Sequence, residues 1–220
     1  SEMRVENMSY TTAYRAIVGS LLWIARCTRP DIMHTVCQLS RFMQNPGYQH
    51  MQRAKRAVQY LAGTRNRGIV WHPKGPDGKM NQVITYSDSS FADQENAKST
   101  YGYLTCLNGG PVDYASKVQL DVAHSTCEAE YVAMSKAIVS AVSMSELLTE
   151  MEIPQETVAV HCDNTAAIAI SAEDKAHMRT RAIKVRYHHI RDEVAAKLVS
   201  IHYLSTNEMP ADLMTKSLAR

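Results

Sequence analysis

The sequence predicts an α/β domain with a mixed sheet flanked by helices, preceded by a small all-helical basic module. Hydrophobic residues recur at helical spacing up to about residue 68 and then in short alternating runs, with a Gly/Pro-rich segment at 72–78 between the two patterns. Charge changes at the same place: residues 1–80 hold 12 Lys and Arg against 4 Asp and Glu, and residues 81–220 hold 12 against 18. We therefore expect a helical segment at 1–71, a linker at 72–79 and an α/β domain at 80–220.

Three helices are expected in the first segment. A dense apolar pattern covers 14–26, and Pro30 suits the first position of a second helix, where its missing N–H costs nothing. That helix extends to residue 43 and is followed by a turn at 45–47. The third helix covers 50–62, ends before Gly63, and has an apolar stripe of Met51, Ala54, Val58 and Leu61.

The second segment alternates between short apolar runs and helical patterns. Residues 108–110, Asn-Gly-Gly, are typical of a hairpin turn between two strands. The expected strands are 83–87, 102–107, 111–116, 157–162 and 198–204, and the expected helices are 126–151, 165–171, 183–197 and 209–218. This order is typical of a mixed sheet with helices packed on it.

Composition excludes several classes of protein. The chain has 220 residues, 45% of them hydrophobic and 21% charged, which is ordinary for a globular domain. No apolar stretch approaches the ~20 residues of a membrane span, and the N-terminus does not resemble a secretory leader, so we expect no membrane association and an intracellular location. The five scattered cysteines contain no Cys-x-x-Cys pair. They predict neither a disulfide framework nor a zinc–thiolate site, and in the strand-like run His161-Cys162-Asp163 alternate side chains face opposite ways.

Two acidic residues follow predicted strands. Asp88 comes at the end of the first strand and Asp163 directly after the fourth. The C-terminal ends of strands are where open α/β sheets bind ligands. Taken alone, Asp163 is better explained as the N-cap of the helix that begins at Thr165.

The long helix offers Glu128 and Glu130. Ser125 and Glu128 form a capping box, which gives Glu128 a structural task. Glu130 instead heads the sheet-facing stripe of Ala133, Ala137, Ala141, Met144 and Leu148. A carboxylate on a buried face is costly unless a cation or donor meets it, so Glu130 is the functional candidate.

Asp212 is expected in the first turn of the last helix, where the helix dipole alone would favour an acid. Taken together, Asp88, Glu130, Asp163 and Asp212 would repel one another unless cations bind. Hard divalent cations such as Mg²⁺ prefer oxygen ligands, and two of them can support phosphoryl transfer. The residues alone leave ordinary surface acids open as an alternative.

Short motifs stand in two groups along the chain. The first group is residues 14–22 (YRAIVGSLL), 28–32 (TRPDI), 39–42 (LSRF), 57–61 (AVQYL) and 63–64 (GT). The second group is residues 86–88 (YSD), 98–103 (KSTYGY), 128–131 (EAEY), 163–164 (DN), 211–212 (AD) and 215–216 (TK). In this order they resemble the C-terminal part of the Pol polyprotein of copia-type (Pseudoviridae) LTR retrotransposons: the first group resembles the connection that follows the reverse transcriptase, and the second its RNase H domain.

This resemblance implies an RNase H-like fold with a five-stranded sheet and a ribonuclease H that cleaves the RNA strand of RNA·DNA hybrids during reverse transcription. It implies two Mg²⁺ ions, with Mn²⁺ able to substitute, on the catalytic and metal-binding residues Asp88, Glu130, Asp163 and Asp212. Ser89 and Asn164 become candidate contacts to the substrate strand. The implied partners are the hybrid, gripped in part by the basic helices, and the upstream polymerase domain of the same polyprotein. The implied location is a cytoplasmic virus-like particle or the nucleus.

The sequence departs from the family pattern in three ways. After Arg179-Thr180 the family commonly has Lys-His-Ile-Asp, where this chain has Arg181-Ala182-Ile183-Lys184. The segment 205–210 lacks the His that many RNases H carry before the last Asp. No Asp-Asp pair occurs anywhere, so the chain does not contain the polymerase site.

Two other functions fit part of these observations. A non-catalytic or domesticated module of the same fold would bind nucleic acid or a protein through the basic helices, but all four acidic positions are filled, which favours the enzyme. An integrase or junction nuclease shares the metal chemistry, but the motifs at 28–31 and 128–131 argue against it.

Overall fold

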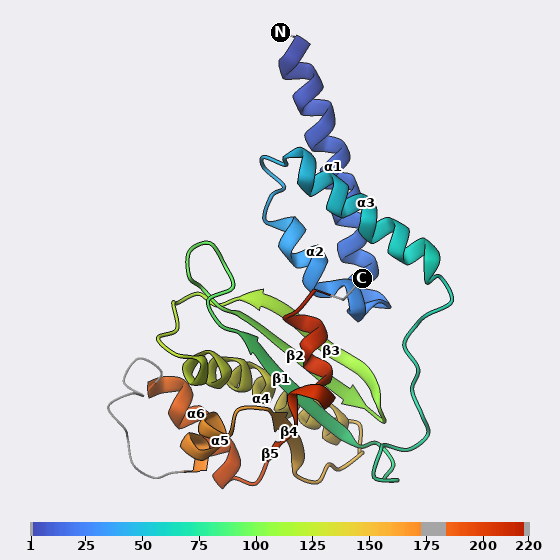
Figure 1. Ribbon diagram of the computed structural model, residues 1–220. Helices are drawn as coiled ribbons and strands as arrows, with labels where there is room; N and C mark the ends of the chain where they lie inside the picture. Colours follow the sequence, from blue (N-terminus) through green and yellow to red (C-terminus); the bar gives the residue numbers. More distant parts are fainter. Residues whose placement is uncertain (1, 173–183, 218–220) are drawn as a thin grey trace. The chain divides into compact units, whose positions relative to one another are not determined.

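A computed structural model describes residues 2–172 and 184–217 of the chain (Figure 1). The chain divides into two compact units between Ile69 and Val70. We call residues 2–69 the helical unit and residues 70–216 the sheet unit. The departure at Ala182 from the family pattern lies outside the described residues.

The helical unit consists of α1 (Glu2–Cys27), the 3₁₀ turn η1 (Pro30–Ile32), α2 (Met33–Ser40) and α3 (Tyr48–Gly63). Pro30 begins η1, as its fixed φ predicts. The side chains of α1 that reach the core recur at helical spacing: Tyr14, Val18, Leu21 and Ala25. The stripe predicted for the third helix was partly wrong: Val58 is 45% exposed and Ala57 is buried instead. Small side chains at Ala54 and Ala57 let α3 approach its neighbours closely.

The linking segment Thr28-Arg29-Pro30-Asp31 has a polar cluster of its own. Arg29 donates to Asp31 from Nε at 2.9 Å and from Nη2 at 2.7 Å, and to the carbonyl and hydroxyl oxygens of Thr64. Tyr60 also donates its hydroxyl to Asp31 at 2.8 Å. These bonds join the start of η1 to the end of α3, which closes the helical unit.

The sheet unit contains five strands in the order β3-β2-β1-β4-β5. The strands are β1 (Val83–Ser90), β2 (Thr100–Leu107), β3 (Gly110–Val118), β4 (Val158–Cys162) and β5 (Val199–Tyr203). The first three pair antiparallel, and β4 and β5 pair parallel to β1. The hairpin turn predicted at 108–110 is shorter than expected: Leu107 pairs with Gly110, so the turn consists of Asn108 and Gly109, both with positive φ, and Gly110 begins β3.

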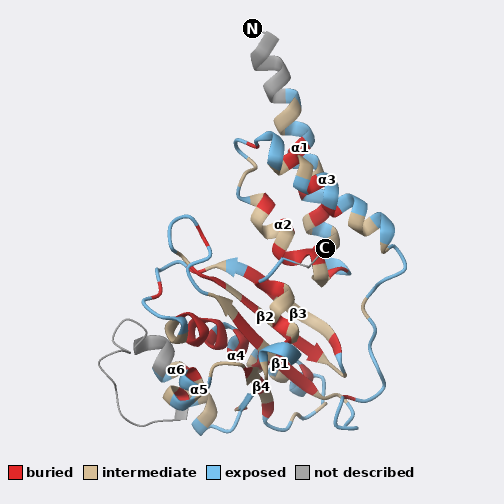
Figure 2. Cartoon of the chain, viewed as in Figure 1, coloured by how far each residue is buried: buried red, intermediate tan, exposed pale blue. Residues whose placement is uncertain are grey.

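The helices of the sheet unit are α4 (Thr126–Glu150), α5 (Thr165–Ala172) and α6 (Lys184–Ala195), and two 3₁₀ turns follow, η3 (Thr206–Glu208) and η4 (Pro210–Met214). α4 packs on the sheet and carries much of the core, including Tyr131, Met134, Ile138 and Ala141 (Figure 2). Among the described residues it is the one helix long and apolar enough to cross a membrane, but its buried half packs inside the sheet unit.

The predicted last helix at 209–218 was wrong as a regular α-helix. Met209 is extended, with φ −77° and ψ 105°, Pro210 begins η4, and the turn ends before Thr215. Pro210 suits a helix start, but Thr215 has φ −121° and ψ −21°, and this departure from helical dihedral angles ends the element after one short 3₁₀ turn.

The segment 72–79, expected as a linker, is attached to the sheet unit by its own bonds. The N–H of His72 donates to the carbonyl of Asn108 at 3.3 Å, and Lys79 forms an ion pair with Glu156 at 2.5 Å. The domain boundaries 1–71, 72–79 and 80–220 stay predictions.

Candidate active site

The four acids named from the sequence come from four separate elements of the sheet unit. Asp88 lies in β1, Glu130 near the start of α4, Asp163 directly after β4, and Asp212 in η4. Because β1 and β4 are parallel, their C-terminal ends meet at one edge of the sheet. The charges of Asp163 and Asp212 both act on Asp88, and those of Asp88 and Asp163 act on Glu130. The fold therefore brings all four carboxylates into one cluster.

Glu130 is the member of the cluster that faces the sheet from α4. Its side chain is 6% exposed, and its Oε1 accepts two bonds from Ser89, from N–H at 3.1 Å and from Oγ at 2.8 Å. Its Oε2 is buried and has no hydrogen-bond partner among the described residues. Burial, together with the charge of Asp88, raises the pKa of Glu130 to about 8. A buried carboxylate oxygen with no donor is costly, so this atom fits a cation ligand.

Asp88 faces the opposite side of the sheet from Ser89, because successive residues of a strand alternate. Its side chain is buried, and Oδ2 accepts a hydrogen bond from the hydroxyl of Thr215. Burial raises the pKa of Asp88 to about 6, and the charges of Asp212 and Asp163 act in the same direction, against the Thr215 bond and Lys216. One carboxylate oxygen of Asp88 is therefore fixed by Thr215, and the carboxylate lies among other negative charges.

Glycine at position 102 permits the contact between Asp88 and η4. Gly102 of β2 pairs directly with Asp88 of β1. A Cβ atom on Gly102 would lie 2.3 Å from Cβ of Met214 and 3.0 Å from Cγ2 of Thr215. Only glycine lets η4 lie this close to the sheet, and the motif at 98–103 therefore contributes to the site.

Asp212 is held by the residue one helical turn later. Nζ of Lys216 lies 2.7 Å from Oδ2 of Asp212, while Oδ1 is buried without a partner among the described residues. Burial alone would lower the pKa of Lys216, but the bond to Asp212 and the charges of Asp88 and Asp163 outweigh it and raise that pKa. Sequence reasoning quoted Thr215 and Lys216 as a motif without a role. Thr215 and Lys216 follow Asp212 by three and four residues, and this spacing could have indicated that they lie beside it.

Asp163 is not the N-cap of α5, so the structural explanation of this residue was wrong. Asn164 caps the helix: its Oδ1 accepts from the N–H of Ala167 at 2.9 Å. Oδ2 of Asp163 instead accepts from the hydroxyl of Thr206 at 2.7 Å. Asp163 thus lies between β4 and η3 with its carboxylate in the cluster.

The two residues expected to contact the substrate strand lie beside the cluster. Ser89 uses its hydroxyl to hold Glu130, and Asn164 uses its carbonyl oxygen as the α5 cap. Their contact with nucleic acid stays a prediction. Glu128 lies at the start of α4 as expected, and its N–H donates to Oγ of Ser125 at 3.1 Å. The other half of the predicted capping box differs, because Oε2 of Glu128 accepts from the N–H of His124 at 2.8 Å and not from that of Ser125.

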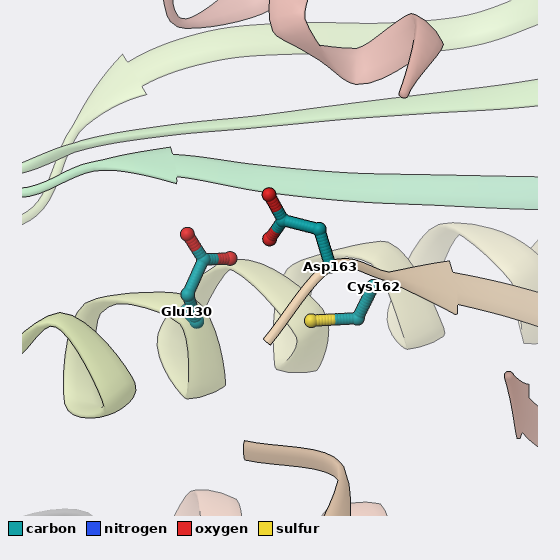
Figure 3. A group of neighbouring side chains, drawn as sticks. All are labelled: Glu130, Cys162 and Asp163. Carbon is teal, nitrogen blue, oxygen red and sulfur yellow. The ribbon is translucent and has the colours of Figure 1, made fainter. Parts of the chain in front are cut away.

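Figure 3 shows Cys162 beside Glu130 and Asp163, and one ligand atom from each of the three lies within 4.8 Å of the others. Burial raises the pKa of the Cys162 thiol to about 12, which keeps it protonated. His161 stacks on Tyr86, with ring centroids 5.3 Å apart. Because side chains alternate along β4, His161 faces the opposite side of the sheet from Cys162. The cluster thus offers mainly carboxylate oxygens, two of them buried and unpaired, and this donor set fits Mg²⁺ or Mn²⁺.

Curated relatives of the chain are Pol polyproteins of plant transposons. It is 39% identical over 208 residues to the retrovirus-related Pol polyprotein from transposon TNT 1-94 of Nicotiana tabacum, covering 94% of this chain and 15% of that protein. It is 37% identical over 211 residues to the one from transposon RE1 of Arabidopsis thaliana, covering 95% and 14%. The chain thus spans about one seventh of these relatives. It also matches the secreted RxLR effector protein 161 of Plasmopara viticola, at 39% identity over 59% of this chain and 89% of that protein.

Solved structures with low sequence identity align with parts of the chain. A foamy viral protease-reverse transcriptase in complex with dsDNA aligns with a TM-score of 0.53 at 13% identity, over 89% of this chain and 38% of that one. LC11-RNase H1 from compost aligns with a TM-score of 0.48 at 19% identity, over 63% and 96%. No family model matches the chain. The sheet unit has the RNase H-like fold, and the chain matches copia-type retrotransposon Pol polyproteins over nearly its whole length.

Proposed function

We propose that this chain is an endoribonuclease that cleaves the RNA strand of RNA·DNA hybrids by two-metal-ion hydrolysis during retrotransposon reverse transcription. The observation that carries the proposal is the convergence of Asp88, Glu130, Asp163 and Asp212, in which one oxygen of Glu130 and one of Asp212 are buried and unpaired. Two Mg²⁺ ions, for which Mn²⁺ would substitute, would be held by these four residues and would supply Lewis acidity and an activated water.

Each carboxylate is oriented by a donor from a different part of the sheet unit. Ser89 holds Glu130, Thr215 holds Asp88, Thr206 holds Asp163 and Lys216 holds Asp212. The three hydroxyl bonds fix the remaining oxygens of Glu130, Asp88 and Asp163 in place and limit the rearrangement needed when ligands bind, whereas the ion pair of Lys216 neutralises Asp212. This arrangement also argues against a decayed, purely binding module, which has no need to keep four oriented acids.

The RNA strand is the proposed target because the 2′-hydroxyl is what distinguishes it from DNA. Ser89 and Asn164 stay the candidate contacts to the substrate strand, since each is next in sequence to a proposed metal ligand.

The helical unit would bind the phosphate backbone of the hybrid without sequence preference. Its α3 buries Met51, Ala54 and Ala57 and exposes Arg53, Lys55 and Arg56 on the rest of its surface. Lys and Arg contacts to phosphates release counterions, so we expect hybrid affinity to fall steeply with salt. The upstream polymerase domain of the same polyprotein is the proposed partner, and a cytoplasmic virus-like particle or the nucleus the proposed location.

Cleavage of a labelled RNA·DNA hybrid tests the proposal, with duplex DNA and duplex RNA as comparison substrates and with Mg²⁺ or Mn²⁺ present. We expect cutting of the RNA strand of the hybrid alone, lost in Asp163→Asn and kept in Lys79→Met, whose ion pair with Glu156 lies at the other end of β4. Cleavage that survives in Asp163→Asn would come from a contaminant and would contradict the proposal.

A further inference from the structure

Lys216 is a cation built into a cluster of acids. Its Nζ lies 2.7 Å from Oδ2 of Asp212, and its charge also acts on Asp88. The Lys216 side chain is 48% exposed and that of Asp212 29% exposed, so the pair lies at the rim of the cluster. The preceding segment 205–210 contains no Lys, Arg or His, which leaves Lys216 as the cation that the local sequence supplies to Asp212.

An exposed pair of this kind, four residues apart, usually contributes little to stability. The surroundings of this one are different, because Asp88 and Asp163 add negative charge around the ammonium group. The interaction energy of Lys216 is therefore spread over three carboxylates. A divalent cation bound through the unpaired Oδ1 of Asp212 would share this carboxylate with the ammonium group on Oδ2, so the two positive charges would oppose each other.

We propose that Lys216 is a tethered counter-cation that competes with a divalent metal ion for Asp212. In the free protein it neutralises part of the carboxylate cluster and weakens metal binding on the Asp212 side. When the metal binds, the ammonium group is released toward solvent at the rim. The inference rests on the proposed function insofar as it takes the cluster to be a metal site. Lys216 is thus a positioning residue that acts through Asp212.

The test is a Mn²⁺ titration of the whole 220-residue chain, with free Mn²⁺ followed by electron paramagnetic resonance. Removing one charge beside the ligand should tighten the weaker binding step by about tenfold in Lys216→Met. Lys216→Arg keeps the charge and should stay close to the wild type. Lys79→Met removes the lysine of another ion pair of the sheet unit and should leave the affinity unchanged.

A double-mutant cycle separates the proposed pair from a general charge effect. In an Asp212→Asn background, Lys216→Met should change Mn²⁺ affinity by less than about twofold, because the carboxylate that both cations share is gone. A full tenfold tightening in that background would overturn the proposed competition. Lys216→Met binding Mn²⁺ no more tightly than the wild type would overturn it as well.

Thermal unfolding gives a second readout. Without divalent ions, Lys216→Met should melt at a lower temperature than the wild type. On addition of Mn²⁺, its melting temperature should rise by more than that of the wild type. Equal gains in the two chains would count against the proposal. If Lys216→Met binds Mn²⁺ with the affinity of the wild type and the wild type still cleaves the hybrid, the counter-cation proposal is overturned and the proposed nuclease function stands. A chain in which neither form binds Mn²⁺ would remove both proposals.

Discussion

The hydroxyl of Thr215 donates to Oδ2 of Asp88 and joins two residues that are 127 positions apart in the chain. Both side chains are buried, and the bond connects the end of η4 with the centre of the sheet. It thereby holds the segment that carries Asp212 against the strand that carries Asp88. The geometry of the cluster depends on this contact as much as on the acids.

Thr215→Val should weaken the protein, because it keeps the shape of the side chain and removes the donor to a buried carboxylate. We expect a loss of roughly 1–3 kcal/mol in the free energy of unfolding. The pKa of Asp88 should rise further, since the bond from Thr215 now opposes the effect of burial. Urea unfolding measures the first effect, and Thr215→Ser, which retains the hydroxyl, is the control. Equal stability of the Val and Ser variants would contradict the role of the bond.

Gly102→Ala should displace η4 from the sheet. The added methyl group would lie 2.3 Å from Cβ of Met214, which is closer than van der Waals contact permits. Overpacking of this kind costs about 1–3 kcal/mol, and hybrid cleavage should fall with it because Asp212 and Thr215 move together. Gly63→Ala is the control, since a Cβ at Gly63 meets nothing within 4 Å. Full activity in Gly102→Ala would show that η4 tolerates the shift.

The stability of the protein should fall as pH rises when divalent ions are chelated. The pKa of Glu130 is raised from 4.5 to about 8 on folding, mainly by burial, so the folded state holds a proton that the unfolded state has released. The favourable contribution is complete below the unfolded pKa and is lost as pH rises through about 8. The slope should not exceed about 1.4 kcal/mol per pH unit for this group.

Unfolding in EDTA across pH 5 to about 8 measures this slope. Glu130→Gln is neutral at every pH and should flatten it, leaving the smaller effect of Asp88, whose pKa is raised to about 6. Added Mn²⁺ should also reduce the slope in the wild type, because a cation favours the ionised carboxylate. A slope that is identical in Glu130→Gln would assign the effect to other groups.

Asp31→Asn should destabilise the helical unit. Arg29 is buried, and its Nε and Nη2 both donate to Asp31, so the substitution leaves a guanidinium charge without its counter-ion. Breaking a pair of this kind costs about 3 kcal/mol or somewhat more. Thermal unfolding monitored by circular dichroism measures the loss. Gln38→Ala removes an exposed bond to Arg41 in the same unit and should change stability by less than about 0.5 kcal/mol.

The sequence by itself determined the kind and order of nearly every element. Apolar spacing near four predicted the helices of the first unit. Short apolar runs on either side of the Asn108-Gly109 turn predicted the hairpin of β2 and β3. The same local logic separated Glu130 from Glu128, because one lies on the sheet-facing stripe and the other closes a cap. These inferences succeeded because periodicity and capping depend on neighbours within a few residues.

Only the tertiary structure decided how the acids are held. Nothing local indicates that Gly102 makes room for η4 or that Ser89 donates to Glu130. The predicted last helix failed for the same reason, since Met214 and Thr215 pack closely on Gly102 of β2 and the chain leaves helical dihedral angles at Thr215. Contacts between elements depend on distances that a chain acquires on folding, and a sequence pattern can predict the elements without the bonds that join them.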